Sequence, residues 1–307
     1  MDVLKTLPDR FVNTVITSPP YFGLRDYGVD GQLGLEETPE IYVKKLVEIF
    51  REIRRTLRDD GTVWLNLGDS YWTKRSNNGL GYIGNTGKSK DYMLRSGNKD
   101  HEFLKSKDMI GIPWRVAFAL QEDGWFLRSD IIWNKPNIMP QSVTDRPTKS
   151  HEYIFLLSKS KNYYYDHEAI KEDSVYKEYS PVRGSDGASG PPQSRIRKSA
   201  DKGTFTGKHG DEAFRAVRNK RNKRTVWTVT TKPVKEAHFA TYPVDLIEPC
   251  VIAGCPVDGI VMDPFIGSGT TAVAAIKHDR NYIGIDLNPD YIEISDRRLN
   301  EVQIELI

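Results

Sequence analysis

Residues 259–287 read GIVMDPFIGSGTTAVAAIKHDRNYIGIDL. Two short apolar runs, 259–265 and 281–287, flank a segment with helical periodicity at 269–279, and a tight glycine turn joins the first run to that segment. This order of strand, helix and strand is a βαβ unit, the building block of parallel sheets. It predicts an α/β fold around a mostly parallel sheet.

The glycine turn is suited to a nucleoside ligand. Gly267 and Gly269 lack a Cβ, so the backbone can approach a ligand closely, and the helix that follows starts with unpaired N–H groups. Asp286 ends the second strand, 17 residues after Gly269, where its carboxylate can accept hydrogen bonds from the hydroxyls of a ribose. The stretch therefore indicates a nucleoside site, with a purely structural tight turn as the alternative.

The identity of the nucleoside depends on the acid before the turn. The spacing Gly267-x-Gly269-x-x-Ala272 also satisfies the dinucleotide fingerprint, while the absence of a Lys after the glycines excludes a P-loop. Asp263 would repel a pyrophosphate but attract a cationic amine. S-adenosylmethionine, with its amine, sulfonium and ribose, fits better than NAD, the cofactor of the alternative, a Rossmann oxidoreductase. The predicted cofactor-binding residues are Asp263, Pro264, Phe265, Gly267, Ser268, Gly269, Thr270 and Asp286.

A second corner, TSPPYFG at 17–23, ends the apolar run of residues 12–18. Pro19 and Pro20 cannot continue a strand or a helix, so the carbonyls of Ser18 and Pro19 have no regular ladder to join. Tyr21 places an aromatic ring directly beside these acceptors. The corner can therefore present acceptors and a ring to a ligand; the alternative is a polyproline turn in which Tyr21 caps the core.

The remaining periodicities complete the α/β pattern. Helices are predicted at 38–57, 112–124, 238–256 and 288–302, and strands at 62–70, 125–135 and 151–160, with a turn at 59–61. The strand at 151–160 is expected to pair with the one before it at an edge of the sheet. Residues 73–107 and 166–225 have weak periodicity and many Gly, Ser, Asn, Pro or basic residues, which predicts loops.

Composition limits the class of protein. The 307 residues can form one large α/β domain with a smaller insertion. The formal net charge is only +2, but residues 195–236 hold 13 Lys and Arg against 4 acids, which suits contact with nucleic-acid phosphates or, alternatively, a solvated loop. Two cysteines and the lack of a long apolar run predict a cytoplasmic protein without a disulfide framework, a metal site or a membrane span.

The two corners together resemble those of the DNA amino-methyltransferases, which methylate N4 of cytosine or N6 of adenine. ITSPPY at 16–21 is similar to their catalytic motif and DPFIGSGTT at 263–271 to their cofactor motif, in the order of the β group. The resemblance also covers GTVWLNLGDSY at 61–71, IIWNKPNIMP at 131–140 and HFATYP at 238–243. It implies a Rossmann-like methyltransferase sheet with circularly permuted motif order and one antiparallel edge strand, S-adenosylmethionine as cofactor, and double-stranded DNA as substrate.

The resemblance also implies roles for single residues. Ser18 and the carbonyl of Pro19, followed by Pro20, would hold the amine of a flipped base, and Tyr21 would stack on that base. Asp2 matches an acid that reaches the cofactor's adenine, although the strand before that acid in the family is missing here, so the sheet is expected to lack an edge strand. The other implied residues are His238 and Phe239 beside the methionine moiety, and Trp133, Lys135 and Asn137 in the target pocket. The charge of the basic stretch, and not the resemblance, predicts that Lys220, Arg221, Lys223 and Arg224 contact DNA.

Three parts are predicted along the chain. They are a catalytic half at 1–165, a loop-rich target-recognition insertion at 166–235 and a cofactor-binding half at 236–307. The recognition sequence would depend on the insertion and on the loop at 73–107. A second copy of the chain, in a homodimer, and a restriction endonuclease that acts on the same site are the other expected partners.

The amine chemistry needs no covalent intermediate. Acceptors that take both amine hydrogens free the nitrogen lone pair for attack on the sulfonium methyl. Cytosine C5 methylation would instead need a thiolate, and Cys250 is predicted to be a buried structural residue. Serine before the two prolines favours N4 of cytosine. N6 of adenine is the alternative, and an inactive DNA-binding relic is a third reading.

Overall fold

The computed structural model describes residues 1–72, 101–173, 220–232 and 241–305. The chain forms two compact units, one made of residues 1–166 and 224–307 and the other of residues 167–223. In the described part of the smaller unit, β5 (Glu172–Asp173) and β6 (Lys220–Arg221) pair as antiparallel strands. The larger unit contains the sheet and all the helices named below.

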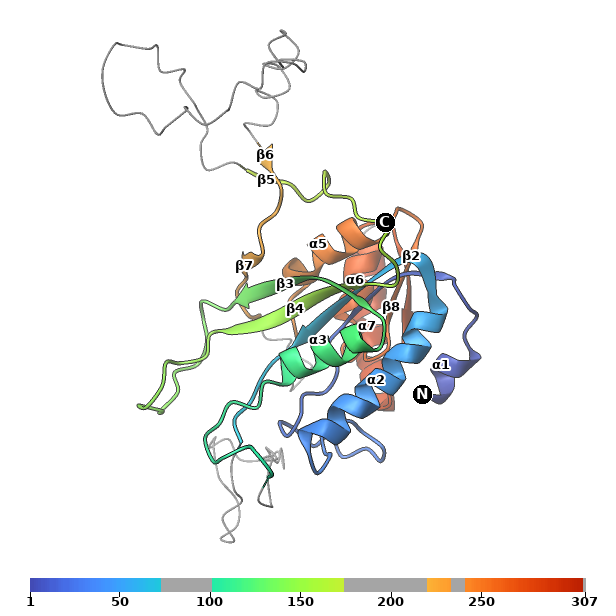
Figure 1. Ribbon diagram of the computed structural model, residues 1–307. Helices are drawn as coiled ribbons and strands as arrows, with labels where there is room; N and C mark the ends of the chain where they lie inside the picture. Colours follow the sequence, from blue (N-terminus) through green and yellow to red (C-terminus); the bar gives the residue numbers. More distant parts are fainter. Residues whose placement is uncertain (73–100, 174–219, 233–240, 306–307) are drawn as a thin grey trace, which may run out of the picture. The chain divides into compact units, whose positions relative to one another are not determined.

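The larger unit is built on a seven-stranded sheet with the order β7-β3-β4-β2-β1-β8-β9 (Figure 1). Six strands run parallel and β4 runs against them, which confirms the mostly parallel α/β fold. The strands are β1 (Val12–Thr17), β2 (Leu57–Leu67), β3 (Phe126–Asn134), β4 (His151–Ser158), β7 (Val226–Thr228), β8 (Ile260–Asp263) and β9 (Asn281–Gly284).

The antiparallel strand β4 lies inside the sheet, so the prediction that it forms an edge strand is wrong. β4 pairs with β3 on one side and with β2 on the other. Its residues Ile154 to Leu157 are at most 5% exposed, because both strand edges and both faces are covered. The edge is formed instead by β7, a strand of three residues in the basic stretch that is too short to show a periodicity.

The turn expected at 59–61 is part of β2. Val12 pairs with Leu57 and Thr14 with Thr62, so the extra residues of β2 bulge out between two pairings with β1. A bulge keeps the chain in the sheet while it absorbs the extra residues, and the acidic side chains there remain exposed.

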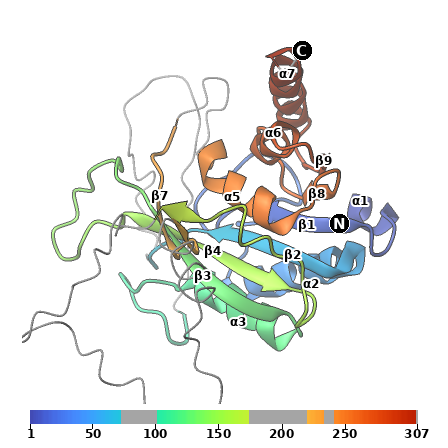
Figure 2. The same cartoon turned by 90° about the horizontal axis from the view of Figure 1, so that it is seen from above.

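Helices cover both faces of the sheet in three layers (Figure 2). α2 (Pro39–Thr56) and α3 (Ile112–Glu122) lie on one face, with the short α1 (Asp2–Thr6) packed against α2. α5 (Val244–Gly254) and α6 (Thr270–Lys277) lie on the other face, and α7 (Pro289–Glu305) packs on the outside of α6. None of the helices in the described ranges is long and apolar enough to cross a membrane.

The periodic positions explain why α2 packs on the sheet. Thr38 caps its first turn by accepting a hydrogen bond from the N–H of Ile41, and Pro39 occupies the first helical position. Leu46, Phe50 and Ile53 share one face of the helix and are fully buried.

The direction of the strands brings distant segments to one edge of the sheet. Parallel strands end at the same edge, so the residues after β1, β2, β3, β8 and β9 meet there. β4 begins at this edge because it is antiparallel: Leu67 at the end of β2 pairs with Tyr153 near the start of β4. Both corners singled out in the sequence therefore lie at the carboxyl edge.

Candidate active site

The SPPY corner leaves β1 at the carboxyl edge, and its two proline carbonyls differ in their partners. Tyr42 of α2 donates a hydrogen bond of 2.7 Å to the carbonyl of Pro20. The carbonyl of Pro19 accepts no hydrogen bond from any residue that the structure describes. The corner is thus fixed through Pro20 and leaves the Pro19 carbonyl available as an acceptor.

Two glycines make room for Tyr21. A Cβ on Gly68, directly after β2, would lie 2.5 Å from Cε2 of the Tyr21 ring, and a Cβ on Gly34 would lie 2.7 Å from the Tyr21 carbonyl oxygen. Real Cβ contacts of this length do not occur, so any other residue at either position would displace the tyrosine.

A hydrogen-bonded network joins Ser18 and Tyr21 to residues of β2 and β4. The Tyr21 hydroxyl lies 2.7 Å from Oε2 of Glu152 and 3.0 Å from Oδ1 of Asn66. Ser18 Oγ lies 3.2 Å from the same Asn66 oxygen and 3.4 Å from the Tyr21 hydroxyl. Asn66 Nδ2 donates to the carbonyl of Tyr153 at 3.1 Å.

Tyr21 keeps its proton throughout the physiological range. Burial raises the pKa of its hydroxyl well above the ordinary value, and the negative charge of Glu152 raises that pKa further. The hydroxyl is therefore a hydrogen-bond donor to Glu152 and not a phenolate.

The predicted target-pocket residues lie beside this network in different roles. Lys135 forms an ion pair with Glu152 and rests over the ring of Trp133 at 4.0 Å. Trp133 is only 2% exposed, and its indole N–H donates to the carbonyl of Val229 at 2.8 Å. Asn137 bonds the backbone of Thr231 through both ends of its amide. Lys135 thus faces the network, while Trp133 and Asn137 hold the strand ends in place.

Asp69, three residues after Asn66, links β2 to the start of α3. Its carboxylate accepts hydrogen bonds from the N–H groups of Gly111 and Ile112, both at 3.0 Å. Lys149 lies 3.9 Å from the same carboxylate and is largely buried, and burial lowers the pKa of its amine. The negative charges of Asp69 and Glu152 raise the pKa of this amine and so oppose the effect of burial. Lys149 is therefore, after Lys135, a second amine close enough to Glu152 to interact with its charge.

One short hydrogen bond joins the two corners. Thr17, the last residue of β1, donates to Oδ1 of Asp263 at 2.6 Å, across the pairing of β1 with β8. Asp263 also accepts bonds from Phe265 N–H, Tyr242 and Thr271, at 3.0, 2.9 and 2.6 Å. Burial raises the pKa of its carboxyl, and these hydrogen bonds oppose the rise. The acid is turned into the protein, so it acts on the corner mainly by fixing the ends of β1 and β8.

The glycine turn has the conformation that a close-approaching ligand requires. Gly267 and Gly269 have φ values of 50° and 83°, which side-chain-bearing residues rarely adopt. A Cβ on Gly269 would lie 2.4 Å from Oγ of Ser295, so helix α7 packs directly on the turn. Arg298 of α7 donates to the carbonyl of Ser268, to its Oγ at 2.8 Å and to Oγ1 of Thr270 at 3.3 Å.

Two backbone hydrogen bonds hold the carboxylate of Asp286 in one orientation. Its two oxygens accept hydrogen bonds from the N–H groups of Gly267 and Asn288, both at 2.9 Å. Burial raises the pKa of this carboxyl. Tyr27 and Tyr291 meet edge to face at 6.2 Å, and the charge of Asp286 helps raise the pKa of Tyr27, which places this aromatic pair close to the acid. A carboxylate beside aromatic rings and an open glycine turn fits a nucleoside.

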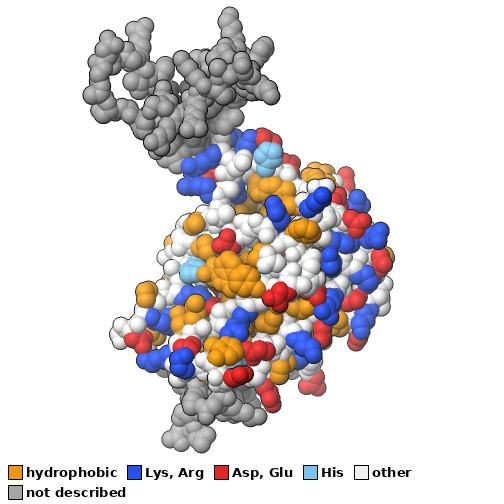
Figure 3. Space-filling view, viewed as in Figure 1, with side chains coloured by type: hydrophobic (Ala, Val, Ile, Leu, Met, Phe, Trp, Pro, Cys, Tyr) orange, Lys and Arg blue, Asp and Glu red, His pale blue; other side chains and the backbone are white. Residues whose placement is uncertain are grey.

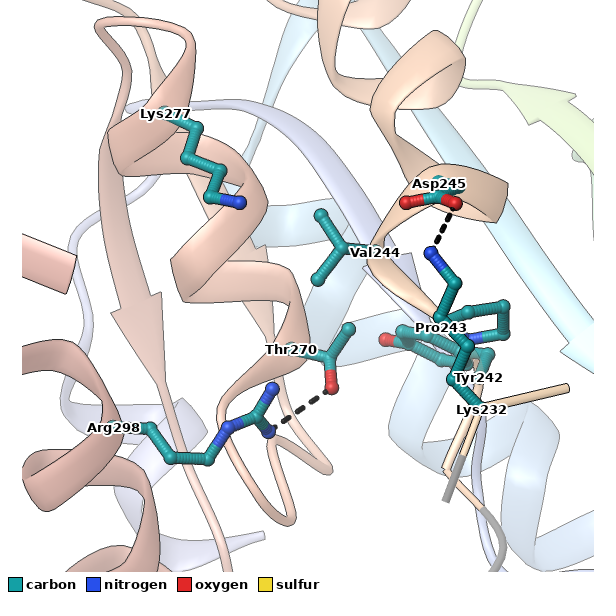
Figure 4. Close-up of a pocket in the computed structure, with 8 residues that line it drawn as sticks. All are labelled: Lys232, Tyr242, Pro243, Val244, Asp245, Thr270, Lys277 and Arg298. Carbon is teal, nitrogen blue, oxygen red and sulfur yellow. Dashed lines mark hydrogen bonds and ion pairs between the residues drawn. The ribbon is translucent and has the colours of Figure 1, made fainter. Parts of the chain in front are cut away.

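A pocket opens beside the start of α6 (Figure 4). It has a volume of about 220 Å³ and runs between α5, α6 and α7. Thr270, Val244 and Pro243 form its inner wall, and Lys232 on its rim pairs with Asp245. Arg298 reaches Thr270 across the floor, so the pocket adjoins the glycine turn.

The structure does not bring every predicted residue to this edge. Asp2 is exposed at the start of α1, a helix held near the amino end of β2 by hydrogen bonds from Arg55 to the carbonyls of Leu4 and Leu7. His238 and Phe239 lie outside the described residues. Lys220, Arg221 and Lys223 belong to the smaller unit, where Arg221 pairs with Glu172, and Arg224 begins the second segment of the larger unit.

Two residues of the network escaped the sequence analysis. Asn66 lies within a stretch noted only as a central strand, and Glu152 within a stretch noted only as target-side. A polar residue near the carboxyl end of a predicted parallel strand is a signal that could have pointed to Asn66. Glu152 could not be found in this way, because its position depends on the antiparallel direction of β4.

Comparison with known proteins identifies the family. The sequence model of the family described as DNA methylase, covering N6 and N4 methyltransferases, matches residues 12–297. The chain belongs to this family. The methyltransferase is 46% identical to Type II methyltransferase M.Cfr9I of Citrobacter freundii and 45% identical to Type II methyltransferase M.SmaI of Serratia marcescens. Each alignment covers 97% of this chain, and 85% and 87% of the respective relatives.

Solved structures share the fold of the methyltransferase. The cytosine-N4-specific PvuII DNA methyltransferase superposes with a TM-score of 0.60 at 16% identity, over 97% of this chain and 86% of that one. TTHA0409 from Thermus thermophilus, a putative DNA modification methylase complexed with S-adenosylmethionine, gives 0.55 at 22% identity over 98% and 92%. The chain is thus an S-adenosylmethionine-dependent DNA amino-methyltransferase of the β group, as the resemblance implied.

Proposed function

We propose that the methyltransferase modifies the exocyclic amine of one flipped base in a specific duplex site, with N4 of cytosine favoured over N6 of adenine. The observation that carries this proposal is the pair of acceptors at the SPPY corner. Ser18 Oγ and the Pro19 carbonyl lie on consecutive residues, and the neighbouring Pro20 carbonyl is already bound by Tyr42.

The two acceptors suit the electronic demand of the reaction. The lone pair of an exocyclic amine is delocalised into the ring, which makes the nitrogen a weak nucleophile. Ser18 and Pro19, by accepting one amine hydrogen each, draw the nitrogen toward a tetrahedral geometry and localise its lone pair. The bound S-adenosylmethionine supplies an electrophilic methyl group on a sulfonium. Extrusion of the base costs a few kcal/mol, which contacts such as stacking on Tyr21 offset.

The residues that would hold the cofactor lie at the glycine turn and at Asp286. Gly267 to Thr270 provide a backbone that can approach closely, and Asp286 offers a fixed acceptor for ribose hydroxyls. The link from Thr17 to Asp263 supports a short, fixed separation between this turn and Ser18. We include His238 and Phe239 in the proposed cofactor site on the basis of resemblance alone. We leave out Asp2, because the structure places its helix near the amino end of β2, away from the glycine turn.

The choice of cytosine rests on a single residue. A serine precedes the two prolines, and we take this as favouring N4 of cytosine, although the acceptors of the corner would serve either amine. We also propose that residues 166–235 select the recognition sequence. The relatives are Type II methyltransferases, which supports the proposal of a restriction endonuclease that acts on the same site, while the homodimer stays a prediction.

The experiment is to identify the methylated nucleoside. Duplex DNA is incubated with the enzyme and S-adenosylmethionine, digested and analysed by mass spectrometry. We expect N4-methylcytosine; N6-methyladenine would establish the alternative base, and 5-methylcytosine would refute the amine mechanism. The cysteines support the expected outcome, since Cys250 is fully buried inside α5 and burial raises the pKa of Cys255 to about 12.

Substitution of Ser18 separates chemistry from cofactor binding. Ser18→Ala removes one of the two acceptors, so methyl transfer should fall by at least about tenfold, as expected for the loss of one hydrogen bond to the reacting amine. S-adenosylmethionine affinity, measured by calorimetry, should stay within a few-fold. A Ser18→Ala enzyme that retains full kcat would show that this corner does not hold the amine.

A further inference from the structure

The chemistry of the partners fixes the orientation of the Asn66 amide. A backbone carbonyl can only accept, so the group that faces the Tyr153 carbonyl must be the Asn66 nitrogen. The amide oxygen then points at Ser18 and Tyr21. Asn66 is only 4% exposed, so that oxygen must receive its hydrogen bond from one of these two hydroxyls.

The single proton of Tyr21 is drawn to Glu152. The hydroxyl lies 2.7 Å from the carboxylate and 3.0 Å from the amide oxygen, and a carboxylate is the stronger acceptor. Lys135 bonds the other oxygen of Glu152 and holds the side chain in place. The Asn66 oxygen is therefore left for the proton of Ser18.

We propose that Asn66 and Glu152 are positioning residues that make Ser18 a pure acceptor for the target amine. Glu152 accepts a hydrogen bond from the Tyr21 hydroxyl and Asn66 accepts one from the Ser18 hydroxyl, so the lone pairs of Ser18 then face the base. A serine hydroxyl without such a partner could point its own hydrogen at the amine and oppose the reaction. This inference rests on the proposed function, because it explains how the Ser18 hydroxyl is oriented so that its oxygen can accept a hydrogen from the target amine.

The first test uses Asn66. Asn66→Leu removes the acceptor for the Ser18 proton, and we expect kcat to fall about tenfold while S-adenosylmethionine affinity and the KM for DNA change by less than about threefold. Asn66→Asp still accepts from Ser18, so it should recover kcat to within a few-fold of wild type. In a Ser18→Ala background, Asn66→Leu should cause no further loss, because it acts through Ser18.

Asn13→Leu is the matched control. Asn13 also bonds the backbone of a neighbouring strand, at 2.9 Å from the N–H of Ile260, but it lies on β1 far from the carboxyl edge. It should lower thermal stability as Asn66→Leu does, and leave kcat unchanged. Equal loss of kcat in both variants, or full activity of Asn66→Leu, would overturn the proposal.

The second test uses Glu152. In Glu152→Gln the amide oxygen must face Lys135, so the amide nitrogen donates to the Tyr21 hydroxyl and turns the tyrosine proton toward Asn66. The Asn66 oxygen becomes a poorer acceptor for Ser18, and kcat should fall several-fold. Tyr21→Phe keeps the ring but removes the hydroxyl that transmits this change. The loss due to Glu152→Gln should therefore be much smaller in the Tyr21→Phe background.

Additive effects of Glu152→Gln and Tyr21→Phe would show that Glu152 acts without the tyrosine and would overturn its assigned role. If Glu152→Gln does not fold, as judged by its thermal transition, the Asn66 and Ser18 combination still decides the proposal. Methylation by the wild-type enzyme is measured first. Failure to form a methylated amine would refute the proposed function, whereas a methylated amine with additive variants would refute only this inference.

Discussion

Asp263 shows how one side chain can serve two neighbouring strands. Its carboxylate is 1% exposed and accepts four hydrogen bonds, from Thr17 on β1, Tyr242 before α5, Thr271 on α6 and the backbone of Phe265. The burial of a carboxylate without such partners would cost several kcal/mol. The acid before the glycine turn is thus required by the packing of the strands and helices around it.

Asp263→Asn should lower the free energy of unfolding by about 1–3 kcal/mol at neutral pH, because one of the two oxygens becomes a donor that faces other donors. Chemical denaturation of the two proteins measures this difference. Asp245→Asn is the control, since Asp245 is about half exposed and pairs only with Lys232 on the surface. Equal stability of wild type and Asp263→Asn would contradict the role of the four hydrogen bonds.

The pH dependence of this difference follows from the raised pKa of Asp263. A group whose folded pKa lies above its unfolded value stabilises the fold fully below the unfolded value, and this contribution is lost as pH rises through the folded pKa. Asparagine does not titrate. The stability advantage of wild type over Asp263→Asn should therefore be largest in acid, shrink as pH rises above about 3.8, the ordinary value, and then level off. Unfolding curves from pH 4 to 8 test this, and a gap that grows with pH would contradict it.

At the scale of elements, helix α7 fixes the glycine turn from outside. Ser295 packs against Gly269, and the guanidinium of Arg298 bonds the backbone and side chain of Ser268 and the side chain of Thr270. A turn with two left-handed glycines is flexible in isolation, because glycine restricts the backbone least. The contacts from α7 hold it in one conformation.

Arg298→Ala should weaken S-adenosylmethionine binding by about tenfold. Alanine removes the Nη1 group that donates to Ser268 and Thr270, and the loss of about 1–1.5 kcal/mol of hydrogen bonding corresponds to that factor. Calorimetric titration measures the change. Arg297→Ala, a change at the exposed neighbour on the same helix, should leave cofactor binding as in wild type. Equal affinities of the two variants would show that α7 does not order the turn.

At the scale of the whole molecule, the surface around α2 and α3 has a balanced charge, whereas the segment at 195–236 that is expected to contact DNA is basic. Figure 3 shows blue and red side chains interspersed over the larger unit on the side that carries α2 and α3. A groove of about 650 Å³ between these helices is lined by Lys44, Arg51 and Arg115 as well as Glu40, Glu122 and Asp123. Such a balanced surface does not favour phosphate contact.

The basic segment should therefore carry the salt dependence of DNA binding. Most of residues 195–236 lie outside the described residues, but Lys220, Arg221, Lys223 and Arg224 are described. Replacement of these four by Ala should flatten the slope of log affinity against log salt by up to about 3.6, at about 0.9 for each phosphate that is no longer neutralised. Titration of cognate and scrambled duplexes at several salt concentrations measures the slope, and cofactor affinity serves as the control for folding. An unchanged slope would show that these four residues do not contact DNA phosphates, and residues 73–107 would then be the candidate DNA-binding segment.

Features of this protein that depend on neighbouring residues could be predicted from the sequence. The alternation of apolar runs predicted the α/β fold and most of the helices and strands, because hydrophobic periodicity is local. Pro19 and Pro20 marked the end of β1, and Gly267 and Gly269 marked the cofactor turn, because each restricts or frees its own backbone. These local signals, in their order along the chain, were sufficient for the family.

The side chains that complete the site could not be predicted from the sequence, because they come together through the folding of distant strands. Asn66 lies 48 residues from Ser18, and Glu152 lies 131 residues from Tyr21. Their contacts depend on the order of the strands and on the register that pairs Leu67 with Tyr153. A shift of one residue in that register would turn Glu152 to the other face of the sheet, and no local pattern records the register. For the same reason the sequence could show an acid at position 263 but could not show that its carboxylate is bound by Thr17, a residue 246 positions earlier in the chain.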